Sequence, residues 1–163
     1  MLIEKIEQNI KKALQEKDEL KSLVLRGVKA AMHNKEIEKR TKLSKEQKDI
    51  NELEKQSKLT EEEIIEVVSS EAKKRREAIE EFKKGGRNEM ADKEKKELEI
   101  LKEYLPEQMS EENVEEEAKK AVEEIGAEGP QDTGKVMSIL MPKLKGKADG
   151  AVVSKIVAKL LKK

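Results

Sequence analysis

The sequence predicts an all-α protein in which an N-terminal helical bundle is followed by a small three-helix tail domain. Apolar residues recur at helical spacing along most of the chain, and no segment alternates apolar and polar residues as a half-buried strand does. Hydrophobic residues make up 35% of the chain and charged residues 44%. Such a composition is also found in disordered chains, but the regular periodicity favours amphipathic helices with charged outer faces.

The first 60 residues predict two helices and a polar stretch. The first helix covers residues 2–16, and Asp18 is a candidate N-cap for a second helix that ends near Arg40. Residues 41–57 are mostly polar, which predicts a loop or an exposed helical insertion, with Ser44 as a candidate cap. The residues predicted to face inward from the two helices are Leu2, Ile3, Ile6, Ile10, Ala13, Leu14, Leu20, Leu23, Val24, Val28, Ala31 and Met32.

Two further helices complete the predicted bundle. Thr60 and Glu63 have the spacing of a capping box, and Gly85-Gly86 ends the helix that they begin. A fourth helix extends from about Asn88 to Leu105, where Pro106 stops it, with Met90, Leu98, Leu101, Tyr104 and Leu105 inward. Four helices with mostly short connections indicate a bundle over residues 1–105.

The tail domain is predicted over residues 106–163. Ser110 caps its first helix, which Gly126 ends, and Asp132 or Thr133 caps a short helix over 134–141 that Pro142 stops. Asp149 caps the last helix. Three short helices make a small core, so we expect packing against the preceding helix to contribute.

Charge is balanced over the chain, with 36 basic and 36 acidic residues, but it is sorted along the tail. Residues 107–132 hold ten acids and two lysines, a net charge of −8, whereas residues 133–163 hold eight lysines and one aspartate, a net charge of +7. The second helix also carries cations, which form either a binding stripe or, as is more usual, a solvated face: Lys21, Arg26, Lys29, Lys35, Lys39 and Arg40.

Composition excludes several classes of site. The chain has no cysteine and a single histidine, His33, so thiolate chemistry and a His-based metal cluster are excluded. No nucleotide-binding, metalloprotease or hydrolase motif is present, and we expect no catalytic residue, metal or cofactor. No apolar run approaches the length of a membrane span or a signal core, which predicts a cytoplasmic protein without a membrane partner. The Glu/Lys richness is typical of thermophilic proteins.

The stretch 134–150, GKVMSILMPKLKGKADG, is the candidate site. Glycine allows close approach of a backbone, and lysine neutralises phosphate, so the pattern predicts an anion-binding turn between two apolar helices. Because aromatic stacking residues are missing, the backbone of a folded RNA is favoured over splayed bases. The alternative, that the glycines only end helices and the lysines only solubilise the surface, stays open. The candidate binding residues are Lys135, Lys143, Lys145, Lys147, Lys155, Gly134, Gly146 and Gly150.

Three segments resemble the GatB/YqeY family, and in particular its free-standing YqeY-type members. They are EYLPEQMSEE (103–112), DTGKVMSILMPKLKGKADGAVVSKIV (132–157) and RGVKAAMHNKEIEKR (26–40). The resemblance implies an all-α fold with a three-helix tail. It also implies the tRNA-engaging module found at the end of the GatB subunit of glutamine-dependent tRNA amidotransferase, without the catalytic cradle of that subunit.

The resemblance therefore implies a non-catalytic tRNA-binding or amidotransferase-associated accessory module. A carbon–nitrogen ligase label with glutamine as amido-nitrogen donor would be inherited from the family. A second hypothesis is a protein-interaction module that docks on an aminoacyl-tRNA synthetase or amidotransferase subunit. A third and weaker hypothesis is an enzyme that transfers an amide on its own, for which no nucleophile or metal site is in view.

Overall fold

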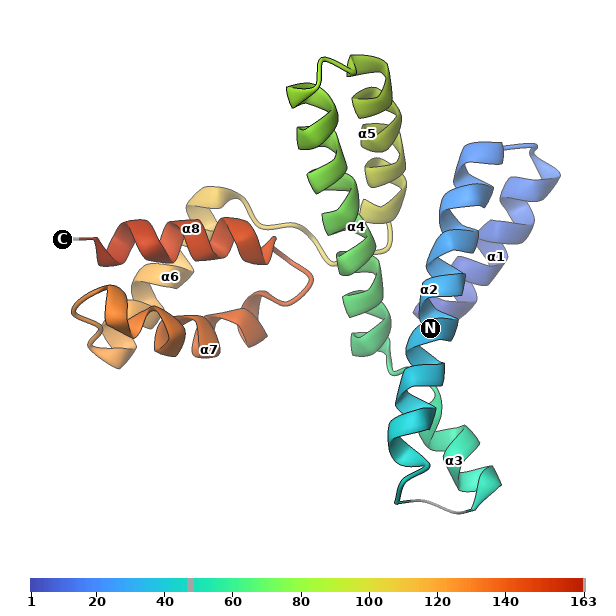
Figure 1. Cartoon of the computed structure of the whole chain (residues 1–163), viewed down its shortest axis with the longest axis horizontal. Coiled ribbons are helices and arrows are strands. Elements are labelled where there is room, and N and C mark those ends of the chain that lie inside the picture. The colour runs from blue at the N-terminus through green and yellow to red at the C-terminus, as the bar shows by residue number, and fades with distance from the viewer. Residues whose placement is uncertain (47–48, 163) are drawn as a thin grey trace. The chain divides into compact units, whose positions relative to one another are not determined.

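The structure, a computed structural model, describes residues 1–46 and 49–162 (Figure 1). The prediction of an all-α fold is confirmed: within those ranges the regular elements are helices, and there is no strand. The chain divides into two compact units, Met1–Tyr104 and Leu105–Lys163. We call them the N-terminal unit and the tail unit. That residues 1–105 and 106–163 are separate domains stays a prediction.

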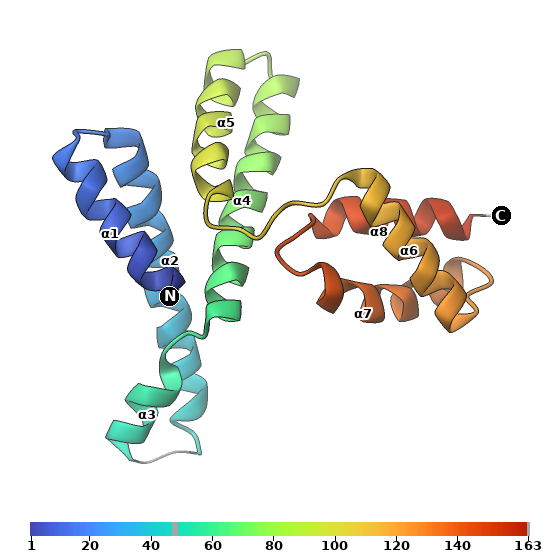
Figure 2. The same ribbon diagram turned by 180° about the vertical axis from the view of Figure 1, so that it is seen from behind.

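The N-terminal unit is built around two antiparallel helical hairpins, which Figures 1 and 2 show from opposite sides. Helix α2 is central, because it contacts α1, α3, α4 and α5, while α4 packs along α5. The elements of this unit are α1 (Leu2–Gln15), α2 (Glu19–Leu43), α3 (Ile50–Ser57), α4 (Glu61–Lys84) and α5 (Asn88–Lys102).

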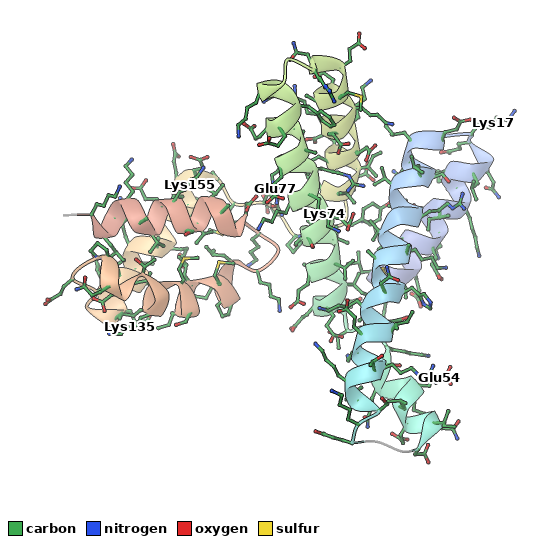
Figure 3. The ribbon with its side chains drawn as sticks, viewed as in Figure 1. Lys17, Glu54, Lys74, Glu77, Lys135 and Lys155 are labelled. Atoms are coloured by element: carbon green, nitrogen blue, oxygen red, sulfur yellow. The ribbon has the colours of Figure 1, made fainter. Side chains whose placement is uncertain are left out.

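The predicted helix ends in this unit are largely confirmed. The Asp18 carboxylate accepts a hydrogen bond from the Lys21 N–H at 3.0 Å and so caps α2. Thr60 and Glu63 form the capping box that begins α4, and Gly85 follows its last residue. The turn between α1 and α2 has Lys17 at φ 60°, the only left-handed non-glycine residue in the described chain. Figure 3 shows this lysine at the tip of the hairpin.

Three residues of this unit that were predicted to face inward are exposed instead. Leu14 is 58% exposed, Leu23 60% and Met90 46%, whereas Leu25 is fully buried. Periodicity locates an apolar stripe but does not say which edge of it meets neighbouring helices. Because α2 contacts four helices, its buried face extends to Leu25 and leaves Leu23 in solvent.

The polar stretch after α2 is more helical than its composition indicates. Helix α2 continues to Leu43, past the predicted end at Arg40, and Ser44 is its C-cap rather than the cap of a following helix. Asp49 caps α3 by accepting hydrogen bonds from the N–H groups of Asn51 and Glu52. Residues 47–48, which belong to the same stretch, lie outside the described residues. The insertion is therefore helical from Ile50 onward.

The residues that follow α5 are held against α1 and α2. Asn9 Nδ2 donates to the Tyr104 hydroxyl at 2.7 Å, and Lys5 Nζ lies 5.3 Å from the centre of the Tyr104 ring. Lys21 forms an ion pair with Glu103 at 2.9 Å. Helix α5 ends at Lys102, before the predicted Leu105, and these contacts anchor the residues that follow it.

The tail unit contains α6 (Glu111–Ile125), the short 3-10 helix η1 (Pro130–Asp132), α7 (Thr133–Leu144) and α8 (Gly150–Leu161). Each of the three α-helices contacts the other two. Its core consists of side chains that are no more than 2% exposed: Val114, Ala118, Ala121, Val136, Leu140, Leu144, Val153, Val157 and Leu161. The tail thus has an apolar centre of its own.

The prediction that Pro142 stops the second tail helix is wrong. Helix α7 continues through Pro142 to Leu144. Proline lacks the N–H that would bond the carbonyl four residues earlier, so it costs one helical hydrogen bond. Leu140 and Leu144, on either side of it, are at most 1% exposed, and their burial holds the last turn in helical form.

Candidate nucleic-acid interface in the tail unit

The connection from α7 to α8 is a tight turn over residues 145–149. Gly146 has φ 74°, in the left-handed region that favours glycine. The Leu144 carbonyl accepts hydrogen bonds from the N–H groups of Lys147 at 2.9 Å and Ala148 at 3.2 Å. Asp149 then caps α8 by accepting from the Ala151 N–H at 2.9 Å. Within these residues, the turn is formed by local backbone hydrogen bonds, the positive φ of Gly146 and the Asp149 cap.

The segment before α6 braces this turn. The Met109 N–H donates to the Lys147 carbonyl at 2.8 Å, and Gln108 Nε2 donates to the Gly146 carbonyl at 2.7 Å. The same Gln108 amide also donates to the Pro106 carbonyl at 2.8 Å. Sequence reasoning missed this brace, because no local pattern links residues 38 positions apart. It fixes where the backbone of the turn lies.

The five candidate lysines are all exposed, but three of them have partners. Lys135 pairs with Asp132 at 3.0 Å, and Lys143 lies 3.5 Å from Glu124 on α6. Lys145, the C-cap of α7, also takes part in an interaction and is not a free cation. For Lys147 and Lys155, the described residues supply neither an ion pair nor a hydrogen bond to the ammonium group.

The structure brings only some of these lysines together. Lys143, Lys145 and Lys147 lie at the end of α7 and in the turn. Lys135 lies in the first turn of α7, about 12 Å from Lys143 along the helix axis at 1.5 Å per residue. Lys155 lies within α8. Figure 3 shows Lys135 and Lys155 on different helices of the tail, at opposite edges of the unit in that view.

The three candidate glycines lie in different local backbone settings. Gly146 supplies the left-handed residue of the turn. Gly150 is the first residue of α8, and a Cβ added there would make ordinary contact with the Met141 side chain at 3.4 Å. A Cβ at Gly134 would meet nothing within 4 Å. Of the three, Gly146 is therefore the one whose backbone conformation favours glycine.

Carboxylates of the tail unit interact with several of its lysines. The hydrogen bond from Lys135, and then that from the Glu128 N–H, hold the pKa of Asp132 below its ordinary value. The Lys120 ammonium lowers the pKa of Glu117, with a smaller contribution from Lys143. The Asp149 carboxylate already occupies the N-terminus of α8, so an anion would have to bind the lysines rather than the amides of that helix.

Across 1–46 and 49–162, no group of three or more histidine, aspartate or glutamate side chains is arranged to hold a metal ion. No helix in those ranges is both long enough and apolar enough to cross a membrane.

Comparison with known proteins places the chain in a family. The family model described as Yqey-like protein matches residues 3–161. A relative named "Altered inheritance of mitochondria protein 41, mitochondrial", from Lachancea thermotolerans, is 30% identical over 100 residues. That match covers 61% of this chain and 46% of the relative, so the chain matches less than half of that protein's length. Because the family model covers nearly every residue, this chain belongs to the Yqey-like protein family.

Proposed function

We propose that the tail unit binds the phosphate backbone of a folded RNA, with transfer RNA as the candidate that the GatB resemblance implies. One observation carries the proposal: Lys147 and Lys155 are exposed ammonium groups without a partner among the described residues, in the segment of net charge +7. Lys143 and Lys145 lie beside Lys147, at the end of α7 and in the turn. Lysines in this setting bind phosphates as point charges.

The ion pairs already formed in the tail are compatible with phosphate contacts. The Lys143 side chain is 53% exposed and that of Glu124 59%, at a distance of 3.5 Å. An exposed pair of this kind contributes about 0–1 kcal/mol, so a phosphate that carries full negative charge competes for the lysine. The ion pair of Lys135 with Asp132 is less exposed than that of Lys143 with Glu124, because the Asp132 side chain is only 14% exposed. We therefore place Lys135 at the edge of the surface.

Recognition in this proposal depends on backbone and shape. Phe82 and Tyr104, the only aromatic residues of the chain, both belong to the N-terminal unit, so the tail has no ring on which a base could stack. A rigid turn, braced by Gln108 and Met109, presents its lysines at fixed positions along the backbone. A folded RNA offers phosphates at equally fixed spacing.

Filter binding of the purified full chain to bulk tRNA over a range of salt concentrations tests the proposal. About four phosphate contacts predict a log–log salt slope of about −3 to −4. Replacing Lys143, Lys145 and Lys147 with alanine should lower the slope by about one for each phosphate contact that is lost. The control is Lys119→Ala with Lys120→Ala, which removes two lysines of α6 that pair with Glu115 and Glu117, so the losses are compared per lysine removed.

Two results would contradict the RNA proposal. One is the absence of saturable, salt-sensitive binding by the wild-type protein. The other is an equal loss of affinity in the α6 control, which would show that net charge alone is responsible. Circular dichroism of each variant checks that the fold is retained.

A second candidate is docking on a protein such as an aminoacyl-tRNA synthetase or amidotransferase subunit. The observation that favours it is the sorted charge of the tail: α6 exposes Glu111, Glu112, Glu116 and Glu123 beside the basic segment. Surfaces that carry both positive and negative charge help to orient the two partners of a protein complex. A pull-down that survives RNase treatment, together with failed tRNA binding, would favour this candidate over the first.

A further inference from the structure

The solvent face of α8 carries a row of three lysines, which we call the α8 lysine row. Lys155, Lys159 and Lys162 are exposed and lie four and three residues apart, so they share one side of the helix. That side is opposite the fully buried Val153 and Val157. At 1.5 Å per residue the row is about 10 Å long. Figure 3 shows Lys155, its first member, at an outer edge of the tail unit in that view.

Lysines on the solvent faces of other helices are matched by acids close in sequence. Lys74 pairs with Glu71 at 2.6 Å and Lys102 with Glu99 at 2.6 Å, each three residues away. Between residues 150 and 163 the sequence has no acid that could do the same. Within the described part of the chain, the ammonium groups of the α8 lysine row accept no ion pair and donate no hydrogen bond. The charge of the row is therefore not neutralised within α8.

The nearest acid on α6 is already engaged by a different lysine. Lys159 acts electrostatically on Glu115, but the pKa of Glu115 is lowered first by its hydrogen bond from Lys119 and only in smaller part by Lys159. The Lys119 ammonium lies 2.8 Å from the Glu115 carboxylate. Two lysines therefore face one glutamate at this edge of α8, and the group keeps a net positive charge.

Two aspartates on the other neighbouring elements are also engaged. Asp132 belongs to η1, which contacts α8, and it pairs with Lys135 at 3.0 Å. Asp149 precedes α8 and accepts a hydrogen bond from the Ala151 N–H at 2.9 Å. It lies six residues before the first member of the α8 lysine row, about 9 Å along the axis. Neither carboxylate is placed to neutralise the row.

The residues beside the α8 lysine row favour one class of partner. The other exposed positions of this face are Ala151, Ser154 and Ala158, so it presents no large apolar or aromatic side chain. Protein interfaces are centred on such anchors. A helix that binds a membrane surface inserts its apolar face, whereas the apolar face of α8 is packed in the tail core. A strand of phosphates needs only the cations.

We propose that the α8 lysine row lies along one strand of an RNA duplex and contacts its phosphates. The inference rests on the proposed function and adds to it the binding face and the form of the RNA. Lys147, in the turn directly before α8, is the other tail lysine without a partner among the described residues. Together with the row it supplies the about four phosphate contacts expected from the salt slope.

The shape of the face favours a duplex over a single strand. Proteins that bind single strands use a groove and aromatic side chains on which bases stack. The solvent face of α8 is the outer surface of one helix, and the tail has no aromatic residue. The phosphates of a duplex are already held in place, so a straight row of cations can contact them without ordering a flexible strand.

Fluorescence anisotropy with the full-length protein tests the inference. The probes are a labelled RNA duplex of about 16 base pairs and one of its strands alone. Bulk tRNA is titrated in parallel as a competitor. We expect saturable binding of the duplex that is at least about tenfold tighter than binding of the single strand, because only the duplex presents its phosphates at fixed positions.

A charge inserted into the row locates the contact. In Ala158→Glu the new carboxylate lies three residues after Lys155 and four before Lys162, so it pairs with both. Duplex binding should weaken at least about tenfold, and the log–log salt slope should fall by about two. The matched control is Ala30→Glu, the same substitution at an exposed alanine of α2, which should change the affinity less than about twofold.

A second pair of variants separates the charge from the fold. Lys159→Gln with Lys162→Gln removes two cations and should lower the salt slope by about two. Lys159→Arg with Lys162→Arg keeps both charges and should retain the wild-type slope. Because all of these positions are exposed, each variant should keep the wild-type circular dichroism spectrum.

The outcomes distinguish this inference from the RNA proposal. If the wild-type protein binds tRNA and Ala158→Glu weakens binding no more than Ala30→Glu does, only the assignment to α8 is wrong. Equal affinity for duplex and single strand would overturn the duplex as ligand. Binding of neither tRNA nor duplex would overturn both proposals. In that case, cosedimentation with vesicles of phosphatidylcholine and phosphatidylglycerol that Ala158→Glu abolishes would mean a membrane surface.

Discussion

The left-handed residue at the centre of the lysine-bearing turn gives the sharpest test of the tail. Gly146 has φ 74°, and an alanine there places its Cβ too close to the following carbonyl oxygen. The expected cost is about 1–2 kcal/mol. The Gly146 carbonyl also accepts the Gln108 amide, so a relaxed backbone would additionally loosen the brace from the segment before α6.

The matched control is Gly134→Ala in α7. A Cβ at that position meets nothing within 4 Å, and the residue is the second of α7, so alanine should stabilise by no more than the about 0.5–1 kcal/mol that it gains over glycine in the middle of a helix. The same substitution is therefore expected to have opposite signs at two positions 12 residues apart. A second comparison is Gly146→Asn, since asparagine tolerates the left-handed region better than alanine and should recover part of the loss.

Hydrogen exchange measured by mass spectrometry on the full-length protein reads out the effect locally. For Gly146→Ala, peptides from α7 and α8 should exchange about 5–30 times faster than in the wild-type protein, the factor that corresponds to 1–2 kcal/mol of opening free energy. Peptides from α4 serve as an internal reference. The reasoning is refuted if exchange in α7 and α8 is unchanged, or if Gly134→Ala accelerates exchange as strongly as Gly146→Ala does.

Three further predictions concern stability. Lys17→Gly should raise the free energy of unfolding by about 0.5–1 kcal/mol, because Lys17 has φ 60°; a lower urea midpoint would contradict this. Leu140→Ala removes a fully buried side chain and should destabilise the tail by about 2–5 kcal/mol, seen as faster exchange in α6 to α8; retention of wild-type protection would refute it. The hydrogen bond from Lys39 holds the pKa of Glu63 below its ordinary value of 4.5, so stability from this pair is present above that pH and is lost as pH falls through the lowered pKa. Lys39→Gln should therefore weaken the pH dependence of the urea midpoint between about pH 5 and pH 3. If the variant loses stability over this range as the wild-type protein does, the pair contributes nothing.

Local patterns determined most of the helix boundaries. Asp18, Thr60, Ser110 and Asp149 cap helices at the predicted positions, and Gly126 ends α6 with φ 66°. These features involve residues two to four apart, and their energetics are local, so the sequence alone contains them. The all-α class follows from the same short-range spacing.

Which apolar side chains are buried is decided by the tertiary structure. Leu23 and Leu25 are equally apolar, yet one is 60% exposed and the other fully buried, because the packing of α1, α3, α4 and α5 around α2 decides between them. Periodicity does not contain the position of those neighbours.

For the candidate interface, the sequence by itself determined the lysine-rich segment and the glycine at its turn. Which lysines are matched by carboxylates, and how Gln108 and Met109 hold the turn, became visible only in the fold. The physical reason is the separation along the chain of the residues that interact. A cap or a φ angle depends on residues close in sequence. A hydrogen bond between residues 38 positions apart forms only after α6, α7 and α8 have packed around their shared core.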